Sequence, residues 1–112
     1  MANDSGVSAL AASPQLLAGL VNYQDGSIVS RTLIKQSAGS VTAFAFDRDQ
    51  ALLEHTAPFD ALVLAVEGEA AVEIDGAPHH LKQGELILLP ADRPHAVRAT
   101  TRFKMLLTMI KA

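Results

Sequence analysis

From residue 27 onward, short apolar stretches alternate with groups of turn residues along the chain. The stretches are rich in β-branched and aromatic side chains, which favour strands, and the turns carry glycine, proline or aspartate. Only one weak helical pattern accompanies them. The sequence therefore predicts an all-β fold, an antiparallel jelly-roll β-barrel, because closing a sheet removes its exposed edges. We expect strands over residues 27–35, 40–46, 51–55, 61–67, 69–74, 79–81, 85–89, 95–100 and 103–110.

Two of the expected strands are apolar on both faces. Residues 62–66 are all apolar, and residues 105–110 are apolar except for one threonine, whereas a strand with one face in water alternates apolar and polar positions. One face of each strand fills the barrel, so the other needs a cover. In a chain this short we expect that cover to be a second copy of the same sheet, and the sequence predicts a homodimer.

The first quarter of the chain has a different pattern. Ser13 followed by Pro14 is typical of a helix start, and the leucines that follow give a short helix one apolar side. We expect this helix to end between residues 19 and 22. The chain is therefore divided into an N-terminal tail with a short helix, residues 1–26, and a barrel domain, residues 27–112.

The composition limits which classes of binding partner and which cellular compartment we expect for this protein. The chain has 112 residues, the size of one domain, and a net charge of −3 with scattered basic residues, so the basic patch of a nucleic-acid-binding protein is missing. There is no cysteine, which fits a reducing compartment. The start of the chain lacks the pattern of a signal peptide, and no run approaches the roughly 20 apolar residues that span a bilayer. We expect a cytoplasmic protein that binds neither nucleic acid nor membranes.

Two histidines lie beside proline-containing turns within the β-rich block. His55 precedes Pro58 and an apolar strand that ends at Gly68, and His95 follows Pro94. Imidazole is the commonest metal ligand among side chains and changes its charge near neutral pH. His55 and His95 are therefore the candidate site residues.

These residues and turns resemble the cupin superfamily, in particular its small single-domain members with one conserved barrel. The first cupin motif places two histidines, a glutamate and a glycine in order, and this chain has His55, Ala57, Ala61 and Gly68 at those positions. The second motif places glycine, proline, glycine, histidine and asparagine, and this chain has Gly84, Pro90, Asp92, His95 and Ala99 there. The resemblance covers residues 27–110 and implies the family's barrel.

The resemblance also implies a centre of iron, manganese, zinc or nickel, but its ligand set is incomplete. Of the four family ligands this chain keeps His55 and His95, while Ala57 and Ala61 replace the other two. A catalytic zinc site usually keeps three protein ligands, and an oxygenase-type iron uses two histidines and a carboxylate. We expect either no metal or a weakly bound divalent transition metal.

Asp60 is the nearest carboxylate that could complete the set. It lies one residue from the glutamate position, and one step along a regular strand turns a side chain to the opposite face. A bulge near Pro58 would re-aim it inward. His79 and His80 lie on a hairpin, where solvated side chains are expected, and Glu67 is expected at a solvated rim.

Three functions fit these observations. The leading interpretation is a small barrel protein that binds a small organic ligand at His55 and His95, with a degenerate metal site. One alternative, which rests on the resemblance, is a metal-dependent enzyme of the dioxygenase or isomerase type that uses both histidines with Asp60 or water. Another is a non-catalytic sensor or interaction subunit that docks through its apolar strands. The sequence does not decide whether the protein is an enzyme, and it identifies neither ligand nor reaction.

Overall fold

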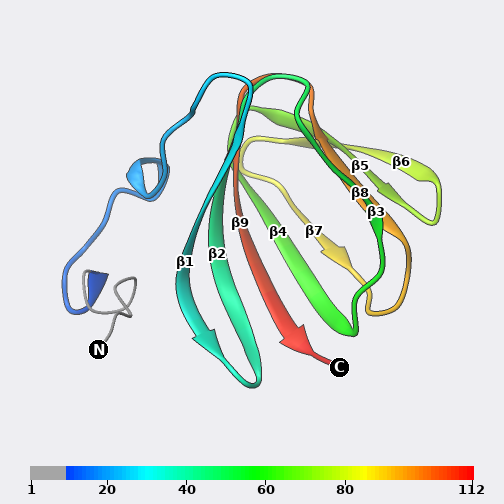
Figure 1. Ribbon diagram of the computed structural model, residues 1–112, viewed down its shortest axis with the longest axis horizontal. Helices are drawn as coiled ribbons and strands as arrows, with labels where there is room; N and C mark the ends of the chain where they lie inside the picture. The colour runs from blue at the N-terminus through cyan, green and yellow to red at the C-terminus, as the bar shows by residue number, and fades with distance from the viewer. Residues whose placement is uncertain (1–9) are drawn as a thin grey trace.

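The computed structural model describes residues 10–112 and confirms the all-β prediction. The described strands form a five-stranded sheet of order β1-β2-β9-β4-β7 and a four-stranded sheet of order β3-β8-β5-β6, and all neighbours are antiparallel (Figure 1). The strands are β1 (Ile28–Gln36), β2 (Gly39–Phe46), β3 (Ala51–His55), β4 (Phe59–Glu67), β5 (Glu69–Ile74), β6 (Ala77–Lys82), β7 (Leu86–Leu89), β8 (His95–Ala99) and β9 (Phe103–Lys111).

The predicted N-terminal helix is reduced to one 3-10 turn, η1 (Leu17–Gly19). Ser13 does not cap it, because the residue before the turn is Leu16 and no side chain supplies a cap hydrogen bond. A helix this short has little stability of its own, and the apolar residues after it instead pack on a sheet. The first nine residues of the predicted tail lie outside the described residues. Residues 10–112 contain no helix with the length and apolar character needed to cross a membrane.

The core lies between the two sheets and follows the alternation of each strand. In β4 the side chains of Ala61, Val63 and Ala65 are buried, while those between them point to the other face. Phe46 and Phe103, neighbours on β2 and β9, place their ring centroids 5.6 Å apart in the same core. The strands converge at one end of the molecule and separate toward the other (Figure 1).

Two turns of the cupin-like motifs depend on left-handed backbone. Gly68 joins β4 to β5 with a φ of +75°, and an added Cβ would lie 1.9 Å from the carbonyl oxygen of Arg102, so only glycine fits there. Asp92 occupies a family glycine position with a φ of 64°, a conformation that aspartate tolerates better than most residues. The substitution therefore preserves the turn that leads into β8.

The outer face of the five-stranded sheet is apolar in two parts. The segment after η1 covers β1, β2 and β9, where Leu20 and Val21 pack on Ala43 and Ala45. Beyond it, strand pairing aligns one row across all five strands, consisting of Ile34, Val41, Thr108, Leu62 and Leu88. Within this uncovered part Leu86, Leu88 and Ile110 are each more than half exposed. The inner faces of β4 and β9 fill the core, part of their outer faces is uncovered, and the homodimer stays a prediction.

Candidate functional site

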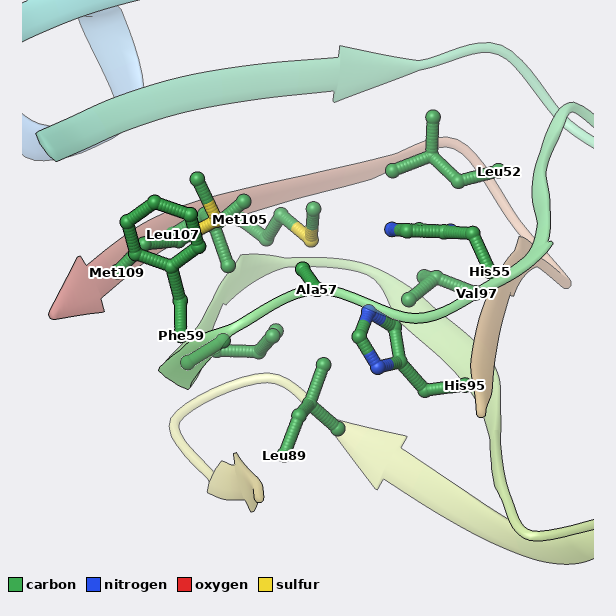
Figure 2. Close-up of a pocket in the computed structure, with 12 residues that line it drawn as sticks. Leu52, His55, Ala57, Phe59, Leu89, His95, Val97, Met105, Leu107 and Met109 are labelled. Carbon is green, nitrogen blue, oxygen red and sulfur yellow. The ribbon is translucent and has the colours of Figure 1, made fainter. Parts of the chain in front are cut away.

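A cavity between the sheets collects the candidate histidines in otherwise apolar surroundings (Figure 2). Its free volume is about 40 Å³, which holds roughly three water-sized groups. Ten of its twelve lining side chains are aliphatic, aromatic or thioether groups. They are Leu52, Ala57, Phe59, Ala61, Val63, Leu89, Val97, Met105, Leu107 and Met109, and the other two are His55 and His95.

His55 and His95 face each other across two paired strands. They are direct partners in the register of β3 and β8, and their ring centroids lie 4.5 Å apart in an edge-to-face arrangement with an interplanar angle of 69°. Edge-to-face contact is a favourable geometry for aromatic rings. The structure therefore brings together the two histidines that the sequence singled out, 40 positions apart.

A bulge in β3 turns His55 toward the cavity. Leu52 pairs with Val97 and His55 pairs with His95, so Leu53 and Glu54 together oppose a single residue of β8. Leu52 and His55 are three positions apart and would lie on opposite faces of a regular strand. The extra residue restores the inward direction, which is how bulges re-aim side chains near sites. The sequence analysis considered a bulge at Pro58, whereas the structure has it before His55.

Hydrogen bonds to backbone carbonyls fix both rings. His55 Nδ1 lies 2.8 Å from the carbonyl oxygen of Leu53, and His95 Nδ1 lies 3.2 Å from that of Arg93. A carbonyl oxygen only accepts, so each Nδ1 carries a proton and donates it. In the neutral imidazole the other nitrogen, Nε2, is then unprotonated. Figure 2 shows both Nε2 atoms directed into the cavity.

The two histidines differ in burial. His55 is exposed at the mouth of the cavity, whereas His95 is 8% exposed. Burial lowers the pKa of the His95 imidazole, its hydrogen bond to the Arg93 carbonyl opposes this, and the neighbouring His55 lowers the pKa further. Both lowering effects disfavour the charged ring. His95 is therefore a neutral hydrogen-bonding group at physiological pH.

Asp60 does not join the two histidines. The pairing of β4 with β9 is regular from Phe59 to Ala61, without a bulge near Pro58. Phe59 and Ala61 line the cavity, so Asp60 between them points to the outer face. Its Oδ1 accepts a hydrogen bond of 3.0 Å from the backbone N–H of Ala91. The carboxylate thus supports the turn before β8, at a position where it cannot share a ligand with His55.

The donors that line the cavity do not fit a tightly held metal ion. Ala57 and Ala61 line it at the two positions where the family carries ligands, and neither has a donor atom. Within residues 10–112 no group of three or more histidine, cysteine, aspartate or glutamate side chains is placed to hold a metal. Zinc and non-haem iron sites usually have three protein ligands. With two imidazoles, the lining falls short of such a centre by at least one donor.

The remaining polar candidates lie elsewhere. His79 and His80 are exposed on β6, as expected for the hairpin, and His80 Nε2 lies 2.6 Å from Glu69 Oε1. Sequence reasoning expected apolar side chains around the two histidines but did not identify which residues they are, in particular Met105 and Met109. The signal was available in the alternation of β9, because positions 105, 107 and 109 share one face.

Comparison with known proteins places the fold among solved cupins. A family model described as "Cupin domain" matches residues 47–111. A conserved protein of unknown function from Streptococcus pyogenes is 33% identical with a TM-score of 0.87, and the match covers 90% of this chain and 89% of that one. A cupin superfamily protein from Desulfitobacterium hafniense is 26% identical with a TM-score of 0.86, covering 90% and 93%.

A third solved structure is more similar in sequence but longer. The cupin 2 conserved barrel domain protein from Leptotrichia buccalis is 43% identical with a TM-score of 0.82, and the match covers 84% of this chain and 46% of that one. This chain therefore spans about half the length of that relative. No curated protein matches the chain. The family model matches more than half of the chain and agrees with the two-sheet barrel, and the chain belongs to the cupin family.

Proposed function

We propose that this protein binds a small, mainly apolar molecule in the cavity between its sheets, with His55 and His95 as the polar contacts. The observation that carries the proposal is the pair of Nε2 atoms directed into an otherwise apolar space (Figure 2). A small-molecule site is typically an apolar concavity with a few polar groups that fix orientation. The cavity has this composition, and its two methionines supply side chains that adapt to different shapes.

Two methionine methyl groups provide a direct test of occupancy. Met105 and Met109 line the cavity, and the chain has three methionines in all, so a methyl spectrum of selectively labelled protein is simple to assign. Xenon, which enters apolar cavities, should shift the Met105 and Met109 signals. Filling the cavity with Ala61→Leu should abolish these shifts, whereas Ala77→Leu on exposed β6 should leave them unchanged. Unchanged Met105 and Met109 signals in the native protein would contradict the proposal.

The enzyme alternative differs from this proposal in its need for a metal. Binding without a metal predicts that protein purified without an affinity tag carries far less than one transition metal per chain. The metal-dependent enzyme predicts one iron, manganese, zinc or nickel ion per chain that is lost in His55→Ala. Elemental analysis of both proteins decides between them, and a stoichiometric metal lost in the variant would overturn the metal-free binding proposal.

The uncovered apolar face supports a homodimer, which is part of the proposal. Ile34, Leu62 and Leu88 lie on one cross-strand row and are between 37% and 55% exposed. A contiguous apolar surface of this kind marks an association site. Leu62→Lys together with Leu88→Lys should convert a dimer to a folded monomer by light scattering. A native protein that runs as a monomer would contradict this part and favour the interaction-subunit alternative.

A further inference from the structure

The cavity offers hydrogen-bond acceptors and no side-chain donors. Both Nδ1–H groups are already donated to the carbonyls of Leu53 and Arg93, so in the neutral rings the Nε2 atoms of His55 and His95 are acceptors. Within residues 10–112 neither Nε2 has a hydrogen-bond partner in the protein. The other lining side chains have no N–H or O–H group. The side chains of the site can therefore accept hydrogen bonds from a ligand but cannot donate them.

We propose that the cavity selects neutral ligands that donate hydrogen bonds from a polar end and are otherwise apolar, such as alcohols, phenols or uncharged amines. This inference rests on the proposed function and names the chemical class of its ligand. A hydroxyl or amine proton reaches the Nε2 lone pair of His55 or His95, and the carbon body contacts the apolar wall. A ligand with two donors satisfies both nitrogens at once.

Other ligand classes are disfavoured by the same geometry. A ketone or a carboxylate brings its own lone pairs toward two Nε2 lone pairs, and neither finds a side-chain donor in the lining. A carboxylate also has its charge buried without a partner, which is costly. A charged ammonium group finds no carboxylate in the lining, because the carboxyl group of Asp60 is exposed on the outer face. Neutral donors are the class that remains.

The size of the cavity limits the ligand further. A free volume of about 40 Å³ admits roughly three or four non-hydrogen atoms. Larger molecules require Met105 or Met109 to change rotamer or must extend through the mouth beside His55. A ligand of four such atoms binds with a Kd no tighter than roughly tens of micromolar. Binding is therefore measured by NMR titration.

The first arm of the test examines the protonation of the rings. Imidazole nitrogen spectra of 15N-labelled, EDTA-treated protein at pH 8, where neutral imidazole predominates, should show His55 and His95 with the proton on Nδ1. A spectrum with the proton on Nε2 of either ring would overturn the inference, because that nitrogen would then present a donor to the cavity.

The second arm compares two ligands of equal size. Propan-2-ol donates one hydrogen bond, and acetone has the same number of non-hydrogen atoms but only accepts. Titrations followed at the Met105 and Met109 methyl groups should give a Kd for propan-2-ol about tenfold lower than for acetone. His95→Leu should reduce this preference, and His80→Leu, a change at an exposed histidine of β6, should retain it.

The outcomes separate this inference from the proposed function. Acetone that binds as tightly as propan-2-ol, or tighter, would overturn donor selection while leaving the cavity a binding site. A tenfold preference that persists in both His95→Leu and His55→Leu would also overturn it, because the selection would come from other groups. If xenon, propan-2-ol and acetone all leave Met105 and Met109 unshifted, the proposed function fails and the inference fails with it.

Discussion

Within residues 10–112 the buried polar side chains are those of His95 and Lys104, and their surroundings differ. Lys104 lies on β9 beneath the N-terminal segment, and His95 lies on β8 inside the cavity. Their exposed fractions are nearly equal, 9% and 8%. What differs is how many of their hydrogen-bonding atoms have a partner within the protein.

Lys104 has partners from the N-terminal segment and from β4. Its Nζ donates a hydrogen bond of 2.6 Å to the carbonyl of Ala18 and lies 3.9 Å from Glu67 Oε1. It also lies 4.8 Å from the ring centroid of Tyr23, whose hydroxyl donates a 2.5 Å hydrogen bond to Glu67. Burial and the Glu67 carboxylate raise the pKa of Tyr23, so its hydroxyl stays a donor. This cluster fastens the N-terminal segment to the sheet.

His95 has one nitrogen partnered and one facing an apolar space. Its Nδ1 donates to the Arg93 carbonyl, and its Nε2 points into the cavity beside His55 (Figure 2). A buried polar atom without a protein partner costs stability, and the fold gains nothing from it. Strain or cost that the fold does not explain is characteristic of functional sites. The comparison therefore favours a structural role for Lys104 and a binding role for His95.

The largest expected effect comes from completing the site. Ala57→His with Ala61→Glu adds two donors to the two histidines, at cavity positions that already face them. Four convergent ligands should bind Zn²⁺ or Ni²⁺ roughly a thousandfold more tightly than the native protein, about 4 kcal/mol, as measured by calorimetry.

A matched control keeps the added side chains and removes the histidines. The same double substitution in a His55→Ala, His95→Ala background should lose most of the gained affinity. If the folded double variant binds metal no better than the native protein, then positions 57 and 61 do not converge with His55 and His95, and the motif alignment is incorrect.

The next largest expected effect is the loss of stability on replacing Lys104. It is smaller than the gain in metal affinity above and larger than the loss of stability expected for a substitution of either histidine. Lys104→Met keeps the apolar stem and removes the ammonium, which leaves the Ala18 carbonyl without its donor. We expect the free energy of unfolding to fall by about 2 kcal/mol in urea titrations. Lys82→Met, at an exposed lysine of β6, should change it by less than about 0.5 kcal/mol. Equal, small losses for both lysines would remove the distinction between the two buried polar groups.

The strands followed from local signals in the sequence, whereas the convergence of His55 and His95, 40 positions apart, followed from the resemblance to the two cupin motifs. The turn at Gly68 was marked by the only residue that fits there, whereas the uniformly apolar residues 62–66 did not show that Val63 and Ala65 are the ones that face inward. The outcome for Asp60 likewise follows from strand parity, since β4 runs regularly past it.

What the sequence did not predict depends on contacts between distant segments. Glu67 was expected at a solvated rim, whereas it accepts a hydrogen bond from Tyr23, 44 positions away. No local pattern marks such a pair. The bulge at residues 53–54 was also missed, because leucine and glutamate carry no bulge signal and only the register with β8 requires an extra residue.

The smallest effect on stability is expected at His95. His95→Leu removes the hydrogen bond to the Arg93 carbonyl but also removes an Nε2 that has no protein partner, and leucine suits the apolar lining. These contributions oppose each other, so the free energy of unfolding at pH 8 should change by less than about 1 kcal/mol. The same variant should reduce the preference for propan-2-ol, which separates binding from stability.

The pH dependence of unfolding tests the same residue with a definite sign. Burial lowers the pKa of His95 in the folded state, so the unfolded chain binds a proton at a pH where the folded protein does not. The contribution of His95 is complete above the ordinary imidazole pKa of about 6.5 and is lost as the pH falls through the lower folded value. The native protein should therefore lose more stability than His95→Leu between pH 8 and pH 5. If the variant instead loses as much stability as the native protein over this pH range, burial in the cavity does not hold His95 neutral. His95 would then resemble Lys104, a buried polar group whose partners lie within the protein.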